Sequence, residues 1–190
     1  MGLFSWLRSR PSDGGDQRAD SLDARLGTGL WRQHRDRFGR AVDRLYATAV
    51  QAQKESAGVP AVTAVVELTH RLSELDQRAA HIAEYAHSRW PLEGLVLPAD
   101  VRQQVGDLPE LLSRAAGKVS EAAQAAAHVR VAVRQADNAG QSGPQAPDPA
   151  AGPADAAAAS AARFVDDAEA LIAEAQTRTG VRGTAGRETP

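Results

Sequence analysis

Apolar residues recur along residues 61–86 at alternating spacings of four and three, with mostly polar residues between them. A helix that buries one narrow stripe against other helices has this a/d pattern. We therefore predict a helix over about 60–89, with Pro60 in the first turn, where proline is tolerated. The stripe consists of Ala61, Val65, Leu68, Leu72, Leu75, Ala79, Ile82 and Ala86.

Three other stretches also carry helical spacing. A first helix is predicted over about 29–56, where Arg35 interrupts a stripe of Trp31, Phe38, Val42, Leu45, Ala49 and Ala52. A third is predicted over about 109–138, after a short helix over 99–106, and it keeps the a/d spacing from Leu108 to Ala136. A fourth, over about 153–178, has a stripe of Ala157, Ala161, Phe164, Ala168, Leu171 and Ala175.

Together these stretches predict an all-α protein, an antiparallel bundle of three to four long coiled-coil-like helices with disordered termini. The predicted bundle core covers residues 28–138, after a flexible tail over 1–27 that carries a short apolar segment. A Pro/Gly/Ala linker over 139–152 leads to the fourth helix, and residues 179–190 form a second tail. The linker leaves open whether the fourth helix packs in its own molecule or in a neighbouring one.

The segment 90–98 breaks the helical pattern, because Pro91 and Pro98 flank a run of apolar residues. We predict that these apolar residues close one end of the bundle. The alternative is an exposed docking patch.

Composition narrows the function classes. The chain of 190 residues has a formal net charge of −2, so its overall charge does not attract nucleic acid or anionic membrane. It has no cysteine, which excludes disulfides, thiol catalysis and thiolate metal sites and fits a cytoplasmic location. Hydrophobic residues make up 43%, many of them alanine, and the abundance of alanine, glycine and arginine indicates a bacterial origin.

Two Glu-x-x-His pairs, Glu67 with His70 and Glu84 with His87, have the spacing that di-iron bundles use. With Leu68, Leu75 and Ile82 in the buried stripe, all four residues fall outside it. Both pairs also lie on one helix, whereas a shared site needs facing helices. We therefore predict no metal site, and we interpret His34, His81 and His128 as surface histidines. No catalytic residue and no cofactor is predicted.

The first ten residues include a dense apolar group formed by Leu3, Phe4, Trp6 and Leu7. On a helix, Leu3, Phe4 and Leu7 would share one face with Trp6 at its edge, which is typical of contact with a membrane surface or a partner groove. The alternative is that these residues fold back onto the bundle or belong to a disordered end. Over Met1 to Ser5 the sequence resembles the start of phage-shock membrane-binding proteins.

The first predicted helix is basic over 32–44, where five arginines face two aspartates and give a net charge of +3. Such a helix could lie on anionic lipid headgroups, or its charges could pair within the bundle. The predicted contact residues for a membrane or a partner are Leu3, Phe4, Trp6, Leu7, Arg32, Arg35, Arg40 and Arg44. Nucleic acid is not expected, because neither interleaved aromatic residues nor a helix-turn-helix pattern is present.

From these features we expect a non-enzymatic protein that acts through protein–protein interaction, as a scaffold or adaptor that could also self-associate. The alternative is a peripheral membrane protein at the inner face of the membrane, which uses the apolar N-terminal segment and the basic first helix. No small-molecule substrate is inferred.

Overall fold

The computed structural model describes residues 24–140 and 152–180, and in these two ranges all regular structure is helical, without strands. This confirms the all-α prediction. The helices are α2 (Leu30–Glu55), α3 (Pro60–Arg89), α4 (Ala99–Val105), α5 (Leu108–Gly140) and α6 (Pro153–Thr179), and a short helical turn over residues 24–26 precedes α2. The predicted tails over 1–27 and 179–190 lie largely outside the described residues.

The helix boundaries agree with the turn chemistry of the sequence. Pro60 and Pro153 occupy the first turns of α3 and α6, where the missing N–H group removes no hydrogen bond. Gly106, with a φ of 56°, separates α4 from α5. Helix α5 continues to Gly140, so the first two residues of the predicted linker over 139–152 are helical.

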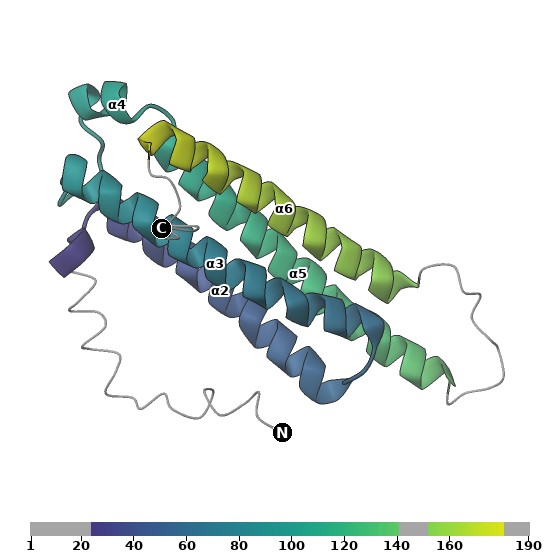
Figure 1. Ribbon diagram of the computed structural model, residues 1–190. Helices are drawn as coiled ribbons and strands as arrows, with labels where there is room; N and C mark the ends of the chain where they lie inside the picture. The colour runs from purple at the N-terminus through teal and green to yellow at the C-terminus, as the bar shows by residue number, and fades with distance from the viewer. Residues whose placement is uncertain (1–23, 141–151, 181–190) are drawn as a thin grey trace, which may run out of the picture.

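The four long helices lie side by side, and each packs mainly against two neighbours (Figure 1). Helix α2 packs against α3 and α5, and α6 packs against the same two helices from the other side. Helices α2 and α3 run in opposite directions, as do α5 and α6, whereas α3 and α6 run in the same direction. Arg71 hydrogen-bonds Glu169 and Arg78 hydrogen-bonds Gln176, both at a separation of 98 residues, which requires parallel neighbours. Helix α6 therefore packs within its own chain.

All eight predicted stripe positions of α3 are buried, which confirms the predicted orientation of this helix. Val62 and Ala83 are buried as well, so the stripe is wider than a strict a/d seam. In α6, four of the six predicted stripe residues are buried, Ala161, Ala168, Leu171 and Ala175, but the buried face extends one residue further than predicted at two positions. Ala158 and Val165 are buried there, while the predicted stripe residues Ala157 and Phe164 are only half-buried.

The core divides into two clusters along the helix axes. The cluster nearer α4, which we call the large-residue half, contains Trp31, Phe38, Leu72, Leu75, Ile82, Leu108 and Ile172 among its members. The cluster at the opposite end contains only alanine and valine, and we call it the alanine–valine half. Its buried members are Ala49, Ala52, Ala61, Val62, Val65, Ala126, Val129, Val133 and Ala158.

In the described part of the chain, none of the helices combines the length and the apolar character that crossing a membrane requires.

Candidate functional site

The predicted contact residues do not form one surface in the part of the chain that the structure describes. Leu3, Phe4, Trp6 and Leu7 lie outside the described residues. Arg40 and Arg44 are exposed, and Arg44 donates a hydrogen bond to Ser120 Oγ on α5 at 3.2 Å. Arg32 has a side chain only 16% exposed and forms an ion pair with Asp36, one turn further along α2, at 2.9 Å.

Arg35 points to the other side of α2, toward α3. Its Nη2 atom donates to Asp76 Oδ2 at 2.8 Å, and its side chain is only 17% exposed. Gly39 leaves room for this pair, because a Cβ atom there would lie 2.7 Å from Arg35 Nη1. Burial raises the pKa of Asp76, and the Arg35 guanidinium opposes this rise only in part. Arg35 therefore links α2 to α3 and is not displayed on the basic face expected from the sequence.

The two Glu-x-x-His pairs lie in different surroundings. Glu67 and His70 are exposed, as their position outside the stripe predicts. Glu84 and His87 are half-buried beneath residues 24–27. The prediction that these two side chains are fully solvated is therefore wrong. Among the described residues no three His, Asp or Glu side chains converge on a position that could hold a metal ion.

Residues 24–27 form a clasp over the C-terminal end of α3. Arg25 forms an ion pair with Glu84, and Leu26 is fully buried. Gly27 has a φ of 59°, and a Cβ atom there would lie 3.0 Å from His87 Cε1. The positive φ and this close approach both favour glycine. The clasp could not be predicted from the sequence, because it depends on two segments that are about 60 residues apart in the chain.

His34 is also not the surface histidine that the sequence predicted. It is half-buried between α2 and α5, where its Nδ1 atom lies 3.4 Å from Ser113 Oγ. Burial lowers its pKa, and the nearby positive charge of Arg37 lowers it further. A neutral imidazole at neutral pH follows from these surroundings.

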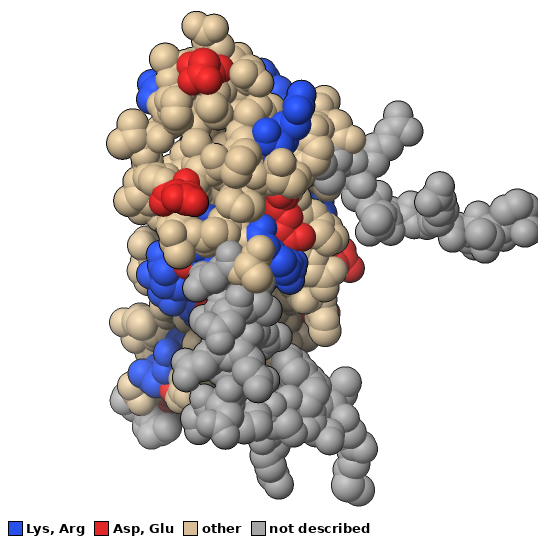
Figure 2. Space-filling view, turned by 90° about the vertical axis from the view of Figure 1, so that its left-hand side faces the viewer, with Lys and Arg blue, Asp and Glu red and all other residues tan. Residues whose placement is uncertain are grey.

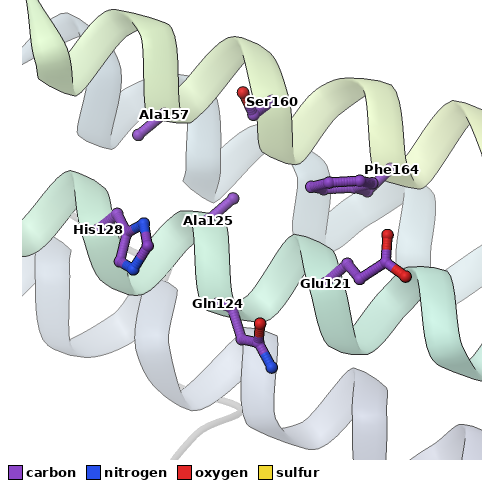
Figure 3. A pocket seen from close by; sticks show the side chains of 7 residues that line it. All are labelled: Glu121, Gln124, Ala125, His128, Ala157, Ser160 and Phe164. Atoms are coloured by element: carbon purple, nitrogen blue, oxygen red, sulfur yellow. The ribbon is translucent and has the colours of Figure 1, made fainter.

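An open groove of about 350 Å³ runs along the outer side of α5 and α6 (Figure 3). The two helices face each other across it, with Ala125 on α5 opposite Ser160 on α6 and His128 opposite Ala157. The small side chains of Ala125, Ser160 and Ala157 leave the space that larger residues would fill. The groove is lined by Glu121, Gln124, Ala125, His128, Ala157, Ser160 and Phe164.

Phe164 closes one end of the groove. Lys118 Nζ lies 5.1 Å from the centroid of its ring, a cation–π distance. The ammonium also pairs with Glu121 at 3.0 Å and with Asp167 at 3.3 Å. The hydrogen bond to Glu121 is the main reason that the pKa of Lys118 is raised. The Phe164 ring thus bounds this end of the groove, and the charged groups of Lys118, Glu121 and Asp167 lie beside it.

The groove was not predicted from the sequence, because it depends on how α5 and α6 are turned relative to each other. One signal was available, since Phe164 is the only aromatic residue in an alanine-rich helix. Its assignment to the buried stripe accounts for the part of the side chain that packs against the core but not for the part that lines the groove.

On the face shown in Figure 2, the described residues form no large area of one charge. Seen from the end that carries α4, acidic and basic side chains are interspersed over the described residues (Figure 2). At the height of α4 the surface in this view is mostly uncharged. Such a surface does not resemble the basic stripe of a nucleic-acid-binding protein.

Comparison of the chain with family models, with curated proteins and with solved structures finds no match. Function is therefore inferred from the geometry of the chain's own residues.

Proposed function

We propose that this chain is a non-enzymatic interaction protein, a scaffold or adaptor, that binds a helix of another polypeptide in the groove between α5 and α6. The observation that carries the proposal is the groove itself, which is apolar at its floor and polar at its rim. An amphipathic helix docks in such a groove by its apolar face.

The residues of the groove suggest how a helix would be held. Ala125 and Ala157 allow the backbone of an incoming helix to approach closely, as small residues do at helix–helix contacts. Phe164 offers an aromatic anchor at one end, and interface energies are commonly concentrated in such residues. Gln124, His128 and Ser160 can hydrogen-bond the partner at the rim.

We also propose that the four long helices form one coiled-coil-like bundle of two antiparallel hairpins. The alternation of four and three in the buried stripe of α3 supports this arrangement, since it is the spacing of knobs-into-holes packing. The role of the bundle is to present α5 and α6 as a rigid face. A cytoplasmic location, suggested by the absence of cysteine, completes the proposal.

The test compares two half-buried alanines on the outside of the molecule, Ala157 in the groove and Ala80 on α3. We expect Ala157→Glu to abolish binding, because it places a charge on the apolar floor, and Ala80→Glu to retain binding. Light scattering detects a second copy of the chain as partner, and pull-down from the host detects a different protein. Melting curves of both variants establish that each is folded.

Two outcomes would contradict the proposal. One is a strictly monomeric wild-type protein without any partner in the pull-down. The other is equal binding by the Ala157→Glu and Ala80→Glu variants, which would move the interaction to another face.

A second candidate function, peripheral membrane attachment, is favoured by a different surface. Leu95 and Val96 are exposed at the end of the molecule that carries α4.

A further inference from the structure

The α6 side of the groove is bulky at one end and small at the other. Phe164 on α6 lies across from Glu121 on α5 at one end, and Ala157 lies across from His128 at the other end (Figure 3). Glu121 and His128 are seven residues apart in the sequence, and so are Ala157 and Phe164. Each pair therefore spans about 10 Å along its helix. The two pairs share one midpoint, which lies beside Ser160.

A two-fold axis through this midpoint, perpendicular to the helices, would bring the bulky end of one copy onto the small end of a second copy. Under this axis α5 lies antiparallel on the other α5, and α6 lies antiparallel on the other α6. Phe164 of each copy then meets Ala157 of the other, so the contact occurs twice. A closed dimer uses the same patch on both subunits in this way. A two-fold axis parallel to the helices would instead bring the two bulky ends together and leave the two small ends empty.

We propose that the occupant of the groove is a second copy of this chain, related by the perpendicular two-fold axis, with Phe164 of each copy inserted at Ala157 of the other. The inference rests on the proposed function, because it names the partner of the same groove. The groove has room for the ring, since its volume is about 350 Å³, whereas an apolar cavity of about 150 Å³ holds a benzene molecule. The exposed part of each ring leaves water when two copies associate, which stabilises the dimer.

The polar residues of the groove are also complementary under this axis. Glu121 of one copy lies opposite His128 of the other, where the imidazole can donate a hydrogen bond to the carboxylate. Gln124 is exposed near the middle of the groove, so the axis brings it next to Gln124 of the second copy, and the two amide groups can hydrogen-bond each other. Lys118 falls level with Val131 of the second copy, so its ammonium meets no like charge there.

The face that α5 and α6 present is large enough for a stable dimer. Helix α6 has 27 residues, so it is about 40 Å long. Two neighbouring helices form a face about 20 Å wide, because one helix with its side chains is about 10 Å across. The resulting area, about 800 Å², matches the area that each partner buries in a typical stable interface.

Two substitutions with opposite effects on size test the contact in the full chain. Phe164→Ala removes the ring, and Ala157→Phe fills the space that the ring of the other copy needs. We expect each variant alone to raise the dissociation constant of the dimer about tenfold or more, since aromatic anchors commonly carry much of the interface energy. An equimolar mixture of the two variants should dimerise about as tightly as the wild type, because a ring meets an alanine at both contacts. Sedimentation equilibrium measures the wild type, each variant and the mixture.

Recovery in the mixture requires that positions 157 and 164 meet between copies, so neither partial unfolding nor a general weakening imitates it. A mixture that associates no more tightly than its two components contradicts the proposed axis, and so do variants that dimerise like the wild type. A wild-type protein that remains monomeric overturns the inference as well. The proposed function survives this last result if pull-down finds a different partner that Ala157→Glu loses and Ala80→Glu retains.

Cross-linking tests the position of the axis without altering Phe164 or Ala157. The chain has no cysteine, so Gln124→Cys and Gln77→Cys each provide a single thiol. Gln77 is the matched control, because it is also an exposed glutamine but lies on α3. A short bis-maleimide should link two copies of Gln124→Cys and leave Gln77→Cys monomeric on a denaturing gel. Equal yields at the two positions, or no product at position 124, would contradict the proposed axis.

Discussion

The two halves of the core are built from different side chains, although the same four helices run through both. In the large-residue half, Trp31, Phe38 and Leu75 are each at most 1% exposed and fill the space between the helices. In the alanine–valine half the helices meet through side chains with few methyl groups, so each buried residue removes less apolar area from water. The difference indicates that hydrophobic stabilisation is concentrated near α4.

The alanine–valine half also has polar contacts at its surface. Glu55, the last residue of α2, accepts hydrogen bonds from Arg130 and Arg134 on α5, both at 2.7 Å. Gln51 donates to the same carboxylate at 2.6 Å. Ion pairs thus link α2 to α5 at this end, as Arg35 and Asp76 link α2 to α3 in the large-residue half. The groove between α5 and α6 extends toward the alanine–valine half, where small residues leave space for a partner.

The largest predicted effect comes from truncating a buried leucine of the large-residue half. Leu72→Ala is expected to lower the free energy of unfolding by about 2–4 kcal/mol, because the deletion leaves a cavity at a side chain that is only 1% exposed. Chemical denaturation monitored by circular dichroism measures this loss. A loss below about 1 kcal/mol would mean that the large residues do not carry the core.

A matched truncation on the same helix, but in the alanine–valine half, should cost less. Val65 is fully buried, and Val65→Ala removes two methyl groups, so we expect a loss of about 1–2 kcal/mol. The same denaturation experiment applies. The comparison would fail if this variant were as unstable as Leu72→Ala.

Lowering the pH should destabilise the fold, because protonation of Glu55 weakens its hydrogen bonds in the alanine–valine half. Its hydrogen bonds, first of all with Arg130, lower its pKa from 4.5 to about 2. A carboxyl with a lowered pKa stabilises the fold above its ordinary pKa, and this contribution is lost as the pH falls from about 4.5 to about 2. Melting temperatures over this range should fall for the wild type and fall less for Glu55→Gln.

The pKa of Asp76, in the large-residue half, is shifted in the opposite direction to that of Glu55. Burial raises its pKa, so its charged form is disfavoured in the folded state, and protonation at low pH relieves that cost. Asp76 therefore does not add to the acid instability that Glu55 causes. If the melting temperature of Glu55→Gln falls with pH as much as that of the wild type, the acid sensitivity does not come from Glu55.

The smallest predicted effect is at His70, which is exposed on α3. His70→Ala is expected to change the free energy of unfolding by less than about 0.5 kcal/mol, as is usual for surface positions. Because His70 lies only two residues from Leu72, the pair also tests the orientation of α3. Similar losses in the two variants would mean that this orientation is wrong.

The helices and the orientation of α3 could be predicted from the sequence, because leucine and isoleucine mark its buried side clearly. The orientation of α6 was predicted less exactly, since alanine occurs on several of its faces and gives little contrast between buried and exposed positions. Phe164 packs against the core but is only half-buried, and the groove that its exposed part lines was not predicted for this reason.

Other failures depend on contacts between elements that are distant in the chain. Arg35 was assigned to an exposed basic face, and its partner Asp76 lies 41 residues away. His34 was interpreted as a surface residue, but Ser113 on α5 lies beside it. A helical period fixes which residues share a face, whereas it does not state which neighbour covers that face.

Amide hydrogen exchange tests the difference between the two halves most directly. Val66 and Ala83 each lie six residues from their nearer end of α3, so fraying affects them alike, but Val66 packs against the alanine–valine half whereas Ala83 is buried next to Ile82 of the large-residue half. We predict that the amide of Ala83 exchanges more slowly than that of Val66, because local opening is easier where less apolar area is buried. Equal rates, or slower exchange at Val66, would contradict the conclusion that the large residues near α4 hold the molecule together.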